Sequence, residues 1–174
     1  MLFGEKREFA IECEITDYVE SFHFCRLRFF VNDEIVGDYD EQVTLGVCLF
    51  NAEIFLENSK YRLAPDTEAM TASQILSKFY YSLFNKDFYE VQMEYEDYTH
   101  RFQMQEIGGD STKDNYAILL LRQSDGKERM VIKKITEMEN EDVFIREAYF
   151  IQGQVDFVVR SFLNWGIQQQ SLVQ

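Results

Sequence analysis

The sequence contains one proline, eight glycines, two histidines and three cysteines among its 174 residues. So little proline and glycine argues against a linker-rich or low-complexity chain. The cysteines, Cys13, Cys25 and Cys48, include no C-x-x-C pair and leave one over, so no disulfide framework is expected. Neither His23 nor His100 has a second histidine or a cysteine at ligand spacing, which argues against a metal site.

Known catalytic and nucleotide-binding motifs are also absent. The sequence has no G-x-S-x-G, no G-x-x-x-x-G-K-[ST], no H-E-x-x-H, and no G-x-G-x-x-G behind a predicted strand. Residues 108–115 resemble a phosphate loop only in composition, and we predict a plain loop there. The sequence therefore predicts no enzyme activity, no catalytic residue, and no bound cofactor or metal.

Long apolar runs are lacking as well. The longest runs without a charged residue, 42–52 and 161–174, are too short or too polar to span a bilayer. The first ten residues contain no apolar segment of the kind found in secretion signals. Together with the odd number of cysteines, these features predict a location in the reducing cytoplasm.

What the sequence does have is negative charge. It carries 31 acidic and 17 basic residues, for a formal net charge of −14. A surface of this kind repels phosphate backbones and anionic lipid, so neither nucleic acid nor a membrane is an expected partner. A basic protein is favoured, because complementary electric fields speed up encounter. The alternative, that the acidic residues only keep the chain soluble, stays open.

The composition predicts one folded domain over residues 1–174, because 46% of the residues are hydrophobic and 16 are phenylalanine. Residues that alternate between apolar and polar predict strands, at 9–17, 22–31, 34–37, 88–96, 99–107 and 143–151. Asn32-Asp33 is the predicted turn before the third of these strands. The last helix is expected between Val155 and Gly166.

Residues 116–135 give the strongest prediction, a β-hairpin. Asp125-Gly126 lies between two apolar runs and favours a two-residue turn. Both faces of the hairpin are then apolar, which predicts a place in the middle of a sheet with cover on each side. The same register sets Arg122 opposite Arg129, a mildly repulsive pair.

Helical spacing appears in two further segments. Residues 40–59 predict an amphipathic helix, with a core-facing stripe made of Val43, Val47, Phe50 and Ile54. Thr71 and Gln74 have the spacing of a capping box at the start of a helix that ends near Asn85. The expected fold is therefore α+β, a single antiparallel sheet of about seven strands with about three helices packed on it.

Two acidic clusters are the candidate partner-binding sites. The first lies on one face of a predicted strand and its tip, and consists of Glu90, Glu94, Glu96, Asp97 and Tyr98. The second lies on a predicted loop, and consists of Glu137, Glu139, Glu141 and Asp142. Like charges in a row repel one another, so a cationic partner would relieve the repulsion. The alternatives are a solvated strand face and a solubilising turn.

The opening of the chain resembles one family of bacterial polymorphic-toxin immunity proteins. The resemblance is carried by the motif G-x-x-x-x-F-A-I, here Gly4, Phe9, Ala10 and Ile11, and by the hairpin at residues 32–38. It covers about the first forty residues. It implies a small cytoplasmic antidote of contact-dependent growth inhibition, which binds a toxin domain delivered by a rival cell and blocks its active site.

The resulting hypothesis is a non-enzymatic immunity protein. Its partner would be the C-terminal domain of a cognate toxin, a basic domain of the nuclease type, bound through acidic contacts. One alternative is a small enzyme or small-molecule-binding domain with a pocket between helices and sheet. Another is a structural subunit of a larger complex, which would expose a broad apolar patch.

Overall fold

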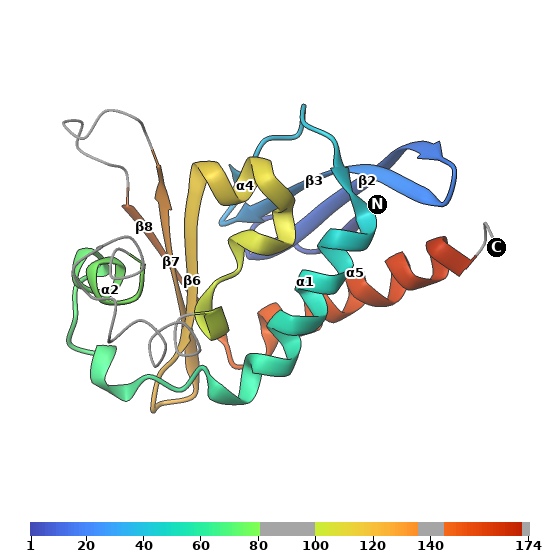
Figure 1. The fold of residues 1–174 in the computed structure, drawn as a ribbon. Helices are drawn as coiled ribbons and strands as arrows, with labels where there is room; N and C mark the ends of the chain where they lie inside the picture. The colour runs from blue at the N-terminus through green and yellow to red at the C-terminus, as the bar shows by residue number, and fades with distance from the viewer. Residues whose placement is uncertain (81–99, 136–144, 172–174) are drawn as a thin grey trace, which may run out of the picture.

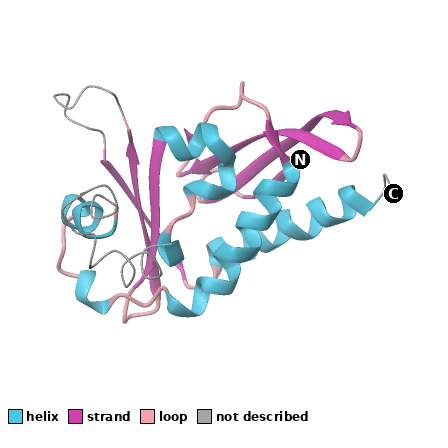
Figure 2. Cartoon of the chain, in the orientation of Figure 1, coloured by secondary structure: helices cyan, strands magenta, loops and turns pink. Residues whose placement is uncertain are grey.

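The computed structural model of the chain describes residues 1–80, 100–135 and 145–171. In this part of the chain the strands form two antiparallel sheets, and four α-helices pack around them (Figures 1 and 2). The predicted α+β class is confirmed. The strands are divided between two sheets, where the sequence predicted one sheet of about seven strands.

The first sheet contains five strands, of which the two long ones form its centre. The strand order is β1-β2-β3-β4, and β5 also pairs with β3. Their bounds are Leu2–Gly4 for β1, Phe9–Val19 for β2, Phe22–Val31 for β3, Glu34–Val36 for β4 and Val43–Thr44 for β5. Short strands occupy both edges, and short edge strands prevent further pairing. The later strands therefore form a sheet of their own.

The second sheet has the order β6-β7-β8, with bounds Tyr116–Arg122, Lys127–Lys134 and Ile145–Ile151. It stands between α2 on one side and the rest of the molecule on the other (Figure 1). Both faces of the β6–β7 hairpin are buried, as the sequence predicted, although β8 leaves Tyr149 and Ile151 exposed. The predicted place in the middle of a sheet is wrong for β6, which is an edge strand of this sheet. Leu120 and Met130 belong to the main core, whereas Leu119 and Val131 belong to a second core beneath α2 (Ala72–Phe79).

The register of the β6–β7 hairpin differs from the prediction by one residue. Its loop has three residues, 124–126, because Gln123 and Lys127 close the hairpin with a backbone hydrogen bond of 2.8 Å. A two-residue turn of the predicted type needs positive φ at both positions, but only Gly126 adopts it, at 82°. Arg122 consequently faces Glu128 and forms an ion pair with it, and the predicted repulsion with Arg129 does not arise.

The motif at the N-terminus has a steric basis. Gly4 pairs with Ala10 at the end of β1 and has a φ of +85°. A Cβ atom on Gly4 would lie 2.3 Å from the carbonyl oxygen of Phe9 and 2.8 Å from Cγ2 of Val158. Only glycine fits, and the residues that follow it in the motif, Phe9 to Ile11, are buried in β2.

The predicted turn between β3 and β4 is confirmed. Asn32 and Asp33 have φ values of 52° and 66°, as a type I′ turn requires. Their amide groups donate to the carbonyl oxygens of Glu8 and Lys6. The turn is thereby attached to the segment between β1 and β2.

Helix α1 (Leu45–Glu57) begins later than predicted and buries a different side. The six residues that face the core are Leu45, Cys48, Leu49, Ala52, Phe55 and Leu56. Three members of the predicted stripe, Val47, Phe50 and Ile54, are exposed instead. The helix is apolar on most of its circumference, so spacing alone could not tell which side packs on the sheet.

Two other helices follow the sequence more closely. At the start of α2, the Thr71 hydroxyl accepts from the Gln74 amide and the Gln74 side chain accepts from the Thr71 amide, so the capping box is confirmed. Helix α5 (Gln154–Ser171) runs past Gly166, where the sequence predicted its end. A Cβ atom on Gly166 would lie 2.3 Å from Cδ2 of Leu49, so this glycine permits close contact with α1.

The secondary structure predicted for residues 100–115 is wrong. The predicted strand over 99–107 is replaced by two short 3₁₀ helices, His100–Phe102 and Gln105–Gly108. The predicted loop over 108–115 contains the seven-residue helix α4 (Gly109–Asn115). Phe102, Met104 and Ile107 are all buried, so the apolar residues do enter the core, but not as alternating positions of a strand. The predicted strand over 88–96 lies outside the described residues.

Several charged side chains are buried where α5 meets the second sheet. Arg62 is fully buried, and its Nη2 lies 2.8 Å from Oδ1 of Asp156 and donates to the carbonyl oxygen of Phe55. Glu128 is also fully buried, beside Arg122, and accepts from the Gly153 amide. Burial raises the pKa of Glu128 above its usual 4.5, and the nearby charge of Asp156 adds to the shift.

Gly4→Ala is expected to lower the free energy of unfolding by about 3 kcal/mol, because it adds a backbone clash to the strain of a positive φ. Gly153→Ala is the matched control, since Gly153 has a φ of +81° but no atom within 4 Å of its would-be Cβ. The control should cost only about 1 kcal/mol of strain. Urea unfolding measures both, and equal losses would contradict the steric account.

Glu128→Gln tests the buried carboxyl. Since its pKa is raised on folding, the folded chain binds more protons than the unfolded chain in the window that begins near pH 4.5. The stability that Glu128 contributes is complete below this window and is lost as the pH rises through the folded-state pKa. The variant's free energy of unfolding, relative to wild type, should therefore increase with pH above 4.5. A difference independent of pH would refute the raised pKa.

Candidate functional site

The two predicted acidic clusters lie outside the described residues. The first comprises Glu90, Glu94, Glu96, Asp97 and Tyr98, and the second Glu137, Glu139, Glu141 and Asp142. Both stay predictions. The candidate surfaces described below come from the remaining chain.

Catalytic and metal-binding groups do not converge in the described ranges. His23 is buried and packs edge-on against Tyr18, with ring centroids 4.8 Å apart. The three cysteines, Cys13, Cys25 and Cys48, are buried and free. Hydrogen bonding to Cys25, together with burial, raises the pKa of the Cys13 and Cys48 thiols. Within residues 1–80, 100–135 and 145–171, no group of three His, Cys, Asp or Glu side chains could hold a metal ion.

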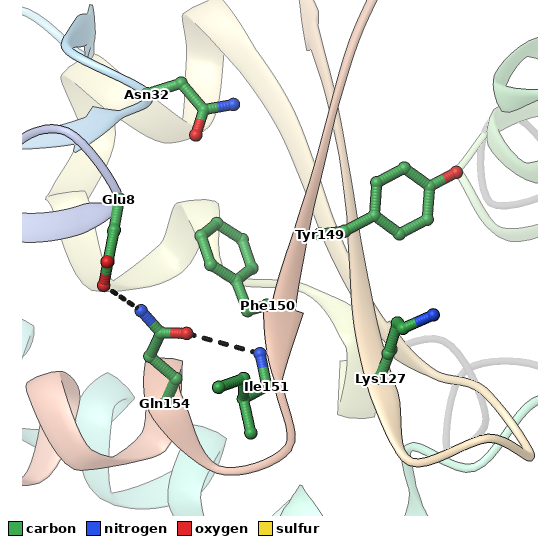
Figure 3. A pocket seen from close by; sticks show the side chains of 7 residues that line it. All are labelled: Glu8, Asn32, Lys127, Tyr149, Phe150, Ile151 and Gln154. Atoms are coloured by element: carbon green, nitrogen blue, oxygen red, sulfur yellow. Dashed lines mark hydrogen bonds between the residues drawn. The ribbon is translucent and has the colours of Figure 1, made fainter.

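A groove of about 400 Å³ lies between the β3–β4 turn and β8 (Figure 3). Two of its polar side chains, Gln154 and Glu8, bond to each other. Gln154 donates to Glu8 and accepts from the Ile151 amide. Glu8 is its only carboxylate among the described residues, and neither His23 nor His100 lines it. The groove therefore lacks the converging titratable groups that an enzyme site would need.

On the outer face of the first sheet, Glu12 is the centre of a cluster of cations and aromatic rings. The guanidinium group of Arg28 lies 2.6 Å from the carboxylate of Glu12 and stacks over the ring of Tyr39 at 4.3 Å. Lys6 adds a second contact to Glu12 at 3.7 Å and lies over the ring of Phe30. Glu12 is thus paired within the molecule, whereas Glu14 and Arg26 on the same face form no ion pair with any described residue.

The solvent side of α1 is different. Val47, Phe50 and Ile54 are spaced i, i+3 and i+7, so they form one continuous line along the helix. Their exposed fractions are 52%, 61% and 37%. We refer to these three residues as the α1 outer face.

Two acidic residues border the α1 outer face. Glu53 and Glu57 are exposed on the same helix, one turn apart, and neither forms an ion pair with any described residue. On the other flank of the helix, Nδ2 of Asn51 donates to the carbonyl oxygen of Glu106 at 2.7 Å. The α1 outer face is therefore an apolar surface with two carboxylates beside it. The bond from Asn51 to Glu106 fixes the opposite flank of the helix.

The sequence analysis missed this surface because it assigned Val47, Phe50 and Ile54 to the core. A signal was available in the only two charged residues of α1. Glu53 and Glu57 lie four positions apart and so share a face. Charged side chains are almost never fully buried without partners, so they mark the side of α1 that faces solvent.

The described helices include none that is long and apolar enough to cross a membrane. The described part of the chain thus combines an acidic composition with an exposed apolar line on α1 and an open groove beside β8.

The crystal structure of CdiI from Burkholderia dolosa AUO158 is similar, with a TM-score of 0.69 at 17% sequence identity, over 95% of this chain and 99% of that one. At this identity the likeness shows a shared fold. No curated protein matches the sequence. The family model described as Immunity protein 42 matches residues 1–165. The chain therefore belongs to the Immunity protein 42 family.

Proposed function

We propose that the chain neutralises the C-terminal domain of a cognate bacterial toxin, delivered in contact-dependent growth inhibition, by binding to it directly. The observation that carries the proposal is the family match over residues 1–165. An immunity protein acts as a non-enzymatic inhibitor, which agrees with the absence of catalytic motifs from the sequence. The likeness in fold to a protein named CdiI supports the same assignment.

The toxin that fits best is a basic domain of the nuclease type. If every basic residue of the chain were paired with an acidic one, fourteen acidic side chains would still lack a partner. A nuclease cleft is built to bind phosphates, so an acidic protein can occupy it with complementary charge. The same field raises the rate of association, which suits an antidote that must capture its toxin before damage occurs.

The first experiment is a growth test. The C-terminal domain of the protein encoded by the adjacent reading frame is expressed from an inducible promoter, with and without this chain. We expect the domain to stop growth when alone and the full chain to restore it, with the two proteins co-purifying in a one-to-one complex. A toxic domain that the chain neither binds nor suppresses would refute the proposal.

The acidic contacts have a test of their own. Replacing Glu94, Glu96 and Asp97 by Gln, Gln and Asn should slow association with the domain and flatten the dependence of the rate on salt. The control removes the same net charge at scattered exposed positions, through Glu5→Gln, Asp17→Asn and Asp33→Asn. Rates from stopped-flow fluorescence that are equal for the two variants would show that the predicted cluster makes no local contact.

A further inference from the structure

We propose that the α1 outer face, Val47, Phe50 and Ile54, is the surface that docks onto the toxin domain, with Phe50 as the central anchor. The inference rests on the proposed function and names the surface that carries it out. It concerns residues other than the two acidic clusters predicted from the sequence.

The α1 outer face is exposed along its whole length. Single exposed apolar residues are common on protein surfaces, but here three follow one another along a single helix. Phe50, at the middle of the line, exposes 61% of its surface. Aromatic side chains near the centre of a patch are the residues that most often dominate binding energy at interfaces.

The described chain does not itself cover the α1 outer face. Helix α1 lies beside α5, which closes one flank through the contact between Gly166 and Leu49 (Figure 1). The 3₁₀ helix Gln105–Gly108 closes the other flank through the bond from Asn51 to Glu106. The core occupies the third side. Among the described residues, none covers the remaining side of α1, which is the α1 outer face.

The charge beside the α1 outer face favours a basic partner. Glu53 and Glu57 border the apolar line and have no counter-ion among the described residues. A basic protein with an apolar recess would bury Phe50 and supply lysine or arginine to both carboxylates, which matches the apolar centre and polar rim of protein interfaces. A second copy of the chain would bring like charges together, and an anionic membrane would repel them.

Helix α1 is also held rigidly in place. The backbone of α1 is fixed on both flanks, and its buried residues pack on the first sheet. A surface that is already ordered loses little conformational entropy on binding. The α1 outer face is therefore suited to tight binding without rearrangement.

The experiment measures binding of the purified full chain to the C-terminal domain of the protein encoded by the adjacent reading frame. Phe50→Ala should weaken binding about 30-fold, as expected for a central anchor, and Phe50→Glu by more than about 100-fold. The double variant Glu53→Lys and Glu57→Lys should slow association and reduce its dependence on salt. The matched control is Ile151→Glu, which places the same charge on a side chain that is 79% exposed in the groove, and which should bind like wild type.

The outcomes separate the surface from the function. If wild type binds and both Phe50 variants bind within twofold of it, the docking surface is wrong and the proposed function stands. If wild type does not bind, the docking surface and the proposed function are both overturned. If wild type sediments as a dimer that Phe50→Glu dissociates, the face joins two copies of the chain and the proposal fails. Urea unfolding of each variant shows whether it is folded, which is expected because Phe50 and Ile151 are exposed.

Discussion

The packing of α1 is the constraint on which the rest of the structure depends. One side of this helix fills the core above the first sheet, and its Leu49 touches Gly166 of α5 so closely that no larger residue fits without movement. The chain that leaves α1 carries Arg62 into a buried ion pair with Asp156 of α5. Breaking a buried pair by removing one partner is strongly destabilising, so this contact holds the two helices together.

The same constraint links the fold to the function. A helix with only Glu53 and Glu57 as charged residues cannot bury all of its apolar surface against one sheet and one neighbouring helix. The remaining apolar line is left at the surface, within a chain whose net charge is −14. Apolar area supplies the affinity at an interface, whereas the surrounding charge selects the partner and speeds its approach.

Local signals in the sequence predicted local structure well. Alternation located β2 and β3, and the Asn32-Asp33 turn follows from two residues that tolerate positive φ. Prediction failed where one sequence pattern is compatible with two different local structures. Asp125-Gly126 serves a three-residue loop as readily as a two-residue turn, which shifted the hairpin register. Periodicity could not choose between the sides of α1, and so the exposed line that includes Phe50 was assigned to the core. The family resemblance read from the first forty residues agrees with the family match.

We infer that the chain presents the outer side of α1 to its toxin. Hydroxyl-radical footprinting of side chains, on the chain alone and in complex with the toxin domain, tests it most directly because Phe50 is exposed and aromatic. We predict that the complex protects Phe50 strongly and leaves Ile151 as reactive as before. A stable complex in which Phe50 keeps its full reactivity would contradict the account.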